Sequence, residues 1–163
     1  MTIVIDASSI ILLAKIDLLE KLIERNPLII PEKVYIEVVK GKEKGMLDAF
    51  ILERLVNEKK IKIEKVEKIA YEEVWKLFGL WAGEAEVLAL ALKNNIPIIT
   101  DDKKCLNRAK AAGVSCITSL DVIIALLKNK HINKEQAKKS LEKLENYGWY
   151  KKNIIKLYKE KIK

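Results

Sequence analysis

Short apolar runs separated by helical patterns restrict the fold of this chain more than any other feature. Residues 2–5 are apolar and β-branched without alternation, which is typical of a strand buried on both faces, and residues 28–30, 96–100 and 114–117 form further buried runs. Residues 61–66 alternate apolar and charged side chains, which predicts an edge strand. Because helical segments separate these runs, the sequence predicts an α/β fold with a central parallel sheet of four to five strands, covered on both sides.

The composition excludes several classes of protein. The chain has 163 residues, half of them apolar and a third charged, which suits one globular domain. No apolar run approaches the roughly 20 residues that span a bilayer, and the start lacks the basic segment of a leader, so we expect a cytoplasmic protein with no membrane partner. Cys105 and Cys116 form no metal-binding pair and His131 lies elsewhere, which argues against a disulfide framework and a zinc site.

The net positive charge lies entirely in the C-terminal part of the chain. Residues 128–163 contain twelve Lys and four Glu and account for the whole net charge of +8. We therefore predict an α/β domain over residues 1–127 and a basic helical hairpin over residues 128–163, appended to the same core. The hairpin can serve a phosphate backbone or an acidic partner, or it can be a solvated helix surface.

Acidic residues stand where the predicted strands end. Asp6 follows the first strand, and Asp101 and Asp102 follow another. Ligands of open parallel sheets bind beyond the carboxyl ends of the strands, so these acids meet at one edge if the two strands are neighbours. Glu37 and Glu84 lie beside apolar helix stripes that could face the same place. Like charges this close need compensation, and carboxylate ligation free of His and Cys suits Mg²⁺ or Mn²⁺, the ions of phosphodiester cleavage.

Each of these acids also has a purely structural interpretation. Asp6 could only cap the following helix, Glu37 could be a solvated helix residue, and Glu84 could complement the helix dipole. Of Asp101 and Asp102, one should cap the next helix and the other should bind metal. We take Asp102 as the ligand.

Other polar and aromatic residues are interpreted as structural. Glu86 falls off the apolar stripe of its helix, and Asp121 stands near a helix start, so neither is placed in the site. Three aromatic residues at helical spacing are predicted to lie in the core: Trp75, Phe78 and Trp81.

An aromatic pair near the C-terminus is open to two interpretations. Trp149 and Tyr150 precede Lys151 and Lys152, so they could contact nucleobases, but we favour hydrophobic packing of the corner at Gly148.

Four of these motifs resemble those of the PIN-domain ribonucleases, the fold of the VapC toxins of bacteria and archaea. The similar segments, in the family's order over residues 1–127, are Asp6 with Ser8, residues 31–37 ending at Glu37, Gly83-Glu84, and Thr100-Asp101-Asp102. The third acid is Glu where the toxins more often have Asp, and the basic hairpin is an addition. In both features the chain resembles a less characterised PIN branch, whose members are found beside toxin–antitoxin pairs and sometimes apart from them.

The resemblance implies a three-layer α/β/α fold with strand order 3-2-1-4-5, homodimers, an antitoxin partner and single-stranded RNA or tRNA as substrate. The first hypothesis is therefore a Mg²⁺- or Mn²⁺-dependent endoribonuclease acting on single-stranded or structured RNA, either as a toxin or apart from a toxin–antitoxin pair. In it Ser8 and Thr100 orient the metal-binding carboxylates through hydrogen bonds. The metal ligands would be Asp6, Glu37, Glu84 and Asp102, with Asp101 as an auxiliary catalytic acid, and the RNA-binding candidates are Lys103, Lys104, Arg108, Lys151 and Lys152.

Two other classes remain as alternatives. A PIN-fold module with weak catalysis could bind RNA or an acidic protein through the basic hairpin. Phosphatases that resemble the haloacid dehalogenases also place a nucleophilic Asp after the first strand, but they need a second Asp two residues later, where this chain has Ser8.

Overall fold

The sheet at the centre of the molecule is five-stranded and entirely parallel. The computed structural model describes all 163 residues, and its strands are β1 (Ile3–Ile5), β2 (Leu28–Pro31), β3 (Ile61–Glu64), β4 (Ile98–Ile99) and β5 (Cys116–Ile117). Their order is β3-β2-β1-β4-β5, which confirms the prediction and leaves β3 at an edge. Val4 of β1 pairs with both Ile29 and Ile98, so β1 is the central strand and is buried throughout.

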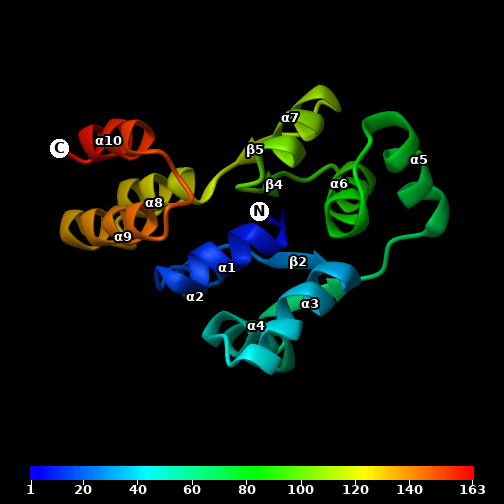
Figure 1. Cartoon of the computed structure of the whole chain (residues 1–163), viewed down its shortest axis with the longest axis horizontal. Helices are drawn as coiled ribbons and strands as arrows, with labels where there is room; N and C mark the ends of the chain where they lie inside the picture. The colour runs from blue at the N-terminus through cyan, green and yellow to red at the C-terminus, as the bar shows by residue number, and fades with distance from the viewer.

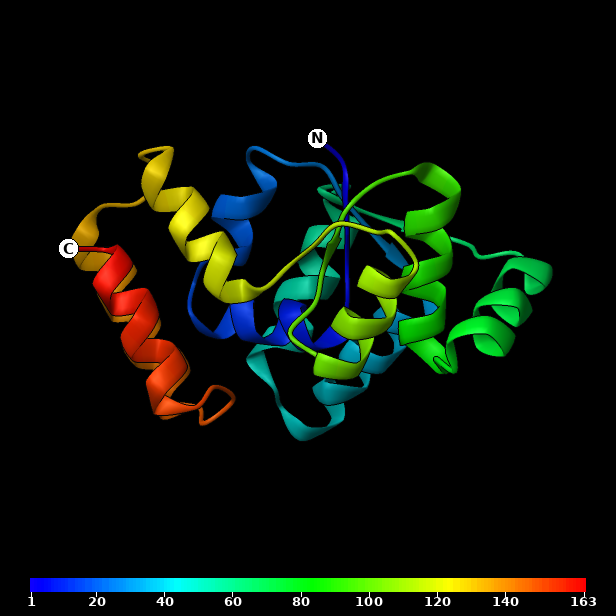
Figure 2. The same cartoon turned by 90° about the horizontal axis from the view of Figure 1, so that it is seen from above.

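Helices cover both faces of this sheet. They are α1 (Ala7–Lys15), α2 (Leu19–Ile23), α3 (Glu32–Val39), the 3₁₀ helix η1 (Lys40–Lys44), α4 (Leu47–Asn57), α5 (Lys68–Phe78), α6 (Ala82–Asn94), α7 (Lys103–Ala111), α8 (Ser119–Lys128), α9 (Lys134–Asn146) and α10 (Lys152–Lys161). Helix α6 lies on one side of the sheet, and α1 and α8 lie on the other (Figures 1 and 2). The molecule is therefore a three-layer α/β/α fold. None of its helices is long and apolar enough to cross a membrane.

Local sequence signals explain where three of the helices begin. Asp6 caps α1, Asp102 caps α7, and Thr118 forms a capping box with Asp121 at the start of α8. These helices follow β1, β4 and β5 directly, and parallel strands end at the same edge of a sheet. The polar caps therefore gather at one edge of the sheet.

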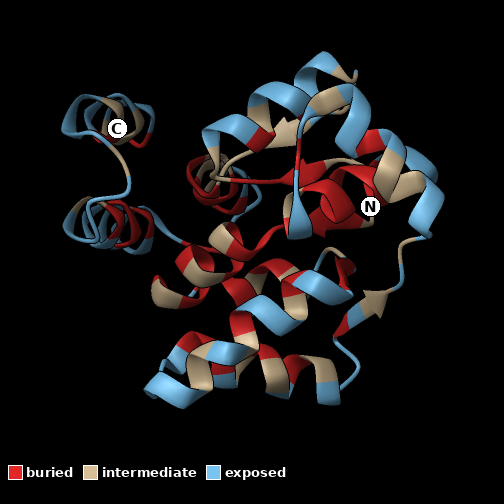
Figure 3. Ribbon diagram, turned by 45° about the vertical axis from the view of Figure 1, so that its right-hand side comes forward, coloured by how far each residue is buried: buried red, intermediate tan, exposed pale blue.

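The basic C-terminal hairpin consists of α9 and α10 and packs on α8. Its apolar residues are buried against the rest of the core, among them Leu141, Leu144 and Ile155. The buried residues otherwise gather around the sheet and α6 (Figure 3). The hairpin lies at the opposite end of the molecule from α5 (Figures 1 and 2).

The prediction that the aromatic residues around α5 lie in the core is wrong for two of the three. Trp75 and Trp81 are exposed, the latter to 57%, and only Phe78 packs partly against the core. Helix α5 lies at one end of the molecule and its main neighbour is α6, so it buries a narrow stripe around Val74. The two indole rings pack on each other instead, with centroids 5.2 Å apart.

Candidate active site

Asp6 stands at the carboxyl end of the central strand and is held by three donors. Its side chain is buried, with the residue 4% exposed. Its Oδ1 accepts hydrogen bonds from the Ser8 hydroxyl and the Ser9 backbone N–H, both at 2.9 Å, and its Oδ2 accepts one from the Thr100 hydroxyl. Burial raises the pKa of Asp6, and these hydrogen bonds oppose the rise. Asp6 therefore caps α1, and its three hydrogen bonds fix the orientation of its carboxylate. About one of the four acceptor positions of this carboxylate remains free for a ligand.

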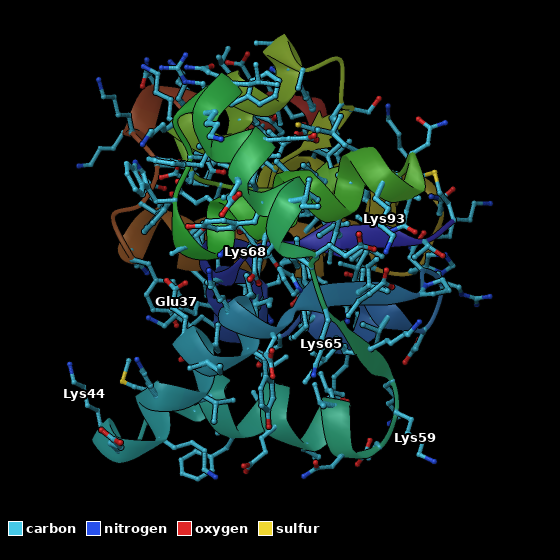
Figure 4. The ribbon with its side chains drawn as sticks, turned by 90° about the vertical axis from the view of Figure 1, so that its right-hand side faces the viewer. Glu37, Lys44, Lys59, Lys65, Lys68 and Lys93 are labelled. Carbon is cyan, nitrogen blue, oxygen red and sulfur yellow. The ribbon has the colours of Figure 1, made fainter.

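Gly83 lets the start of α6 approach α3, which carries Glu37. A Cβ atom at position 83 would lie 3.1 Å from Val34 Cγ2 and 3.2 Å from Glu37 Oε2. A side chain at position 83 would therefore make Val34 and the Glu37 carboxylate shift by a few tenths of an ångström, which gives the Gly83-Glu84 motif a physical reason. Glu37 extends from α3 at the surface of the molecule (Figure 4).

Glu84 is electrostatically coupled to the other three predicted ligands. Burial raises its pKa most, and the negative charges of Asp102, Asp6 and Glu37 raise it further, whereas Lys104 opposes the rise. No hydrogen bond contributes to this shift. The structure therefore brings the four acids predicted as ligands into one electrostatic neighbourhood, hereafter the acidic cluster: Asp6, Glu37, Glu84 and Asp102.

Asp102 caps α7, the role that the sequence analysis left to Asp101. Its Oδ1 accepts a hydrogen bond of 2.7 Å from the Cys105 backbone N–H. Its own backbone N–H donates to the Thr100 hydroxyl at 3.2 Å, so Thr100 contacts both Asp6 and Asp102. The second carboxylate oxygen of Asp102 has no protein partner and is available to a ligand.

The donors of the acidic cluster suit a hard cation, although their atoms do not yet converge on one point. No group of three or more His, Cys, Asp or Glu side chains is arranged to hold a metal ion. All four donors are carboxylates, which is the chemistry that Mg²⁺ and Mn²⁺ prefer. Glu37 is exposed and Glu84 is half-buried, and neither carboxylate accepts a hydrogen bond from the protein. The residues present therefore fit such an ion.

One family model covers almost the whole chain. A family model described as a PIN domain (DUF3368) matches residues 2–163. The chain belongs to the PIN-domain family. PIN domains are generally nucleases, so membership indicates a nuclease-like role, and the matched range includes the basic hairpin.

Solved structures share the fold of this PIN domain at low sequence identity. PAE2754 from Pyrobaculum aerophilum is 18% identical, with a TM-score of 0.55 over 78% of this chain and 99% of that chain. VapBC2 from Rickettsia felis, bound to a DNA fragment from its promoter, is 16% identical, with a TM-score of 0.50 over 72% of this chain and 98% of that chain. A comparison with curated proteins gives no match.

Asp101 is not part of the acidic cluster of this PIN domain. Its carboxylate accepts hydrogen bonds from the Ser9 hydroxyl at 2.7 Å, from the Ser119 backbone N–H at 2.9 Å and from the Ser119 and Tyr150 hydroxyls. Its backbone carbonyl accepts a further bond from Trp149 Nε1 at 3.1 Å. A carboxylate has about four acceptor positions, so the side chain has none left for a metal or a reacting proton. The structure therefore argues against the predicted role as an auxiliary acid.

Sequence reasoning could not find this network, hereafter the Asp101 tie, because Ser9 and Tyr150 lie 92 and 49 residues away from Asp101. The tie connects α1, α8 and the corner of the hairpin to the end of β4. The structure thus assigns Tyr150 a specific partner.

Glu86 and Asp121 have structural partners, as predicted. Glu86 Oε2 accepts a hydrogen bond of 3.2 Å from the Lys33 backbone N–H, at the start of α3, and the Lys33 ammonium lies 3.5 Å from Oε1. Burial raises the pKa of Asp121, but hydrogen bonds from Tyr158 and Thr118 outweigh this and leave it lowered. The expectation that Glu86 lies off the buried stripe is wrong, since Glu86 is only 8% exposed and more buried than Glu84.

The predicted RNA-binding residues lie in two exposed groups. Lys103, Lys104 and Arg108 are exposed on α7, and Lys151 and Lys152 are exposed where α10 begins. Lys103 and Lys151 line the same pocket as Asp102. Basic side chains therefore stand next to the acidic cluster.

Proposed function

We propose that this protein is a cytoplasmic endoribonuclease that requires Mg²⁺ or Mn²⁺ and cleaves single-stranded or structured RNA. One observation carries the proposal: at the edge where the strands end, the negative charges of Asp102, Asp6 and Glu37 lie close enough to Glu84 to raise its pKa beyond the effect of burial. The Lys104 ammonium offsets this repulsion only in part, so the negative charge of the cluster is not neutralised within the protein. A divalent cation, when bound, would activate water and neutralise charge developing on a phosphate.

The chain's own residues would divide the work. Asp6, held by Ser8 and Thr100, is the rigid ligand, since hydrogen bonds from surrounding donors fix the direction of its carboxylate. Glu37 and Glu84 are the adaptable ligands, and Asp102 offers one oxygen while its other oxygen caps α7. The exposed bases of α7 would hold phosphates on the side where RNA approaches. One or two ions would fit this set of ligands.

A cleavage assay with a matched charge control tests the proposal. Labelled RNA would be incubated with the wild type and Asp6→Asn in Mn²⁺, Mg²⁺ and EDTA. We expect cleavage only with the divalent ions, and loss of cleavage in Asp6→Asn with an unchanged melting temperature. Glu73→Gln removes an exposed acid of α5 outside the cluster and should cleave like the wild type. Cleavage by Asp6→Asn at the wild-type rate would refute the assignment.

We also propose protein partners. A homodimer is supported by exposed apolar side chains of α5, because Leu77 is 75% and Ile69 is 71% exposed. Light scattering on the eluting protein should give twice the mass of the chain, and Leu77→Glu should give the monomer. An antitoxin-like partner is supported only by the VapBC2 neighbour, and a small antitoxin-like reading frame beside the gene would strengthen that proposal.

The basic hairpin favours a second candidate function. A PIN module that binds RNA or an acidic protein without useful turnover would depend on the exposed lysines of α10. It predicts salt-sensitive RNA binding in EDTA, reduced by replacing Lys152 and Lys156 with Gln, and no cleavage in Mn²⁺. Metal-dependent cleavage abolished by Asp6→Asn would exclude it.

A further inference from the structure

A pocket of about 300 Å³ lies between the hairpin corner and the start of α7. Leu106 and Ile154 form apolar parts of its wall, together with the aromatic residues Trp149 and Tyr150. Thr100 and Asp102 also line it, and these two residues belong to the edge that carries the acidic cluster. The pocket therefore adjoins the candidate active site.

Trp149 presents an aromatic face of fixed position to this pocket. Trp149 is 50% exposed, yet its Nε1 donates a hydrogen bond to the Asp101 carbonyl. The next residue, Tyr150, donates to the Asp101 carboxylate, so the corner is anchored at two points. A half-exposed indole ring that is already fixed by a hydrogen bond loses little conformational freedom when a ligand stacks on it.

The charges around the pocket favour an anionic ligand. Lys103 and Lys151 line it and are exposed, and no ion pair neutralises either of them within the chain. The Asp101 carboxylate is already occupied by four donors, and one oxygen of Asp102 caps α7. The pocket thus combines an aromatic face and apolar walls with two free cations, which is the combination that single-stranded nucleic acid uses for binding.

We propose that this pocket binds one nucleobase of the RNA strand, stacked on Trp149, with neighbouring phosphates on Lys103 and Lys151. The volume is at the low end for small-molecule sites, which suits one base and excludes a folded protein segment. The hairpin would then position RNA relative to the acidic cluster. This inference rests on the proposed function in naming RNA as the ligand, but its test does not depend on cleavage.

Trp149 can be made the only tryptophan of the full-length protein by replacing Trp75 and Trp81 with Phe. A single-stranded oligoribonucleotide and an abasic oligomer of the same length would be added in EDTA, so that no metal-dependent cleavage takes place. We expect the oligoribonucleotide to quench Trp149 fluorescence and the abasic oligomer to quench it much less.

Substitutions then separate stacking from anchoring. Trp149→Ala should weaken RNA binding about tenfold, the effect of one lost base stack. Trp149→Phe keeps a ring but loses the N–H bond to Asp101, so it should retain most of the affinity. Tyr147→Ala is the matched control, because it removes an exposed aromatic of the same corner that does not line the pocket. It should bind like the wild type, and melting curves of all variants identify any that fail to fold.

Three results would overturn the inference: equal quenching by the abasic oligomer, wild-type affinity in folded Trp149→Ala, or stronger quenching by polyglutamate than by RNA. Cleavage abolished by Asp6→Asn alongside unchanged binding by Trp149→Ala would remove the pocket and leave the proposed function intact. Base-dependent quenching without any cleavage in Mn²⁺ would support the pocket and remove the proposed function.

Discussion

Asp101 and Asp102 are adjacent in the chain, yet they belong to two regions with opposite electrostatic character. Asp102 joins the acidic cluster, where its carboxylate accepts one hydrogen bond and its negative charge raises the pKa of Glu84. Asp101 joins the tie, where four donors from three segments surround one carboxylate. For these two neighbours, the number of donors within reach decides whether the carboxylate is fully occupied or keeps an oxygen available to a ligand.

The tyrosine of the tie reinforces this difference. Burial raises the pKa of the Tyr150 hydroxyl, and the nearby Asp101 charge raises it further. The phenol therefore stays protonated at neutral pH and continues to donate to Asp101. In the acidic cluster burial also raises the pKa of Glu84, but there the neighbouring acids add repulsion and no hydrogen bond fixes the carboxylate.

The largest expected effect separates the two regions by activity. Asp102→Asn should reduce metal-dependent RNA cleavage at least about 100-fold, because it removes a charged ligand and not merely an outer partner. Asn caps helices about as well as Asp, so the melting temperature should change little. Initial rates in Mn²⁺ and a thermal melt measure both. A large loss of stability with retained cleavage would place Asp102 among the structural acids.

Asp101→Ala should show the opposite pattern. It leaves the donors of Ser9, Ser119 and Tyr150 without an acceptor, which should lower the free energy of unfolding by about 3 kcal/mol. Urea unfolding measures the loss, with Asp102→Asn as the matched control one residue away. Equal stability of the two variants would contradict the distinction between the regions.

Tyr150→Phe tests a single bond of the tie. Three donors to Asp101 remain after the substitution, so we expect a loss of about 1–1.5 kcal/mol in unfolding free energy. Tyr158→Phe provides a comparison, because Tyr158 donates to Asp121 at 2.6 Å in a similar half-buried setting. If Tyr150→Phe changes stability far less than Tyr158→Phe, the corner is anchored by Trp149 alone.

The smallest expected effect concerns pH. The folded-state pKa of Glu84 lies above its usual 4.5, so the ionised form is disfavoured by folding. In EDTA this contribution destabilises the protein at about pH 7 and disappears as the pH falls through the raised pKa towards 4.5. Glu84→Gln should therefore melt above the wild type at neutral pH, and the difference should shrink on acidification. Addition of Mg²⁺ should raise only the wild-type curve, and a pH-independent difference would contradict the raised pKa of Glu84.

Apolar runs and helix caps are local signals, so the sequence was enough to predict the five strands, the parallel sheet and the acids at the ends of β1 and β4. The strand order followed from resemblance to the PIN domains. Glu37 and Glu84 were found through local motifs, and their coupling in the structure adds a physical link between them.

The roles of these residues depend on tertiary contacts. Asp101 and Asp102 are the same amino acid, and what distinguishes them is the set of partners 18 to 92 residues away from Asp101. The packing of α1, α8 and the hairpin brings these partners together. The exposure of Trp75 and Trp81 has the same origin, since α5 lies at one end of the molecule and finds little to cover it. Periodicity states which side chains share a helix face, but the neighbour that covers the face, or its absence, is a property of the whole fold.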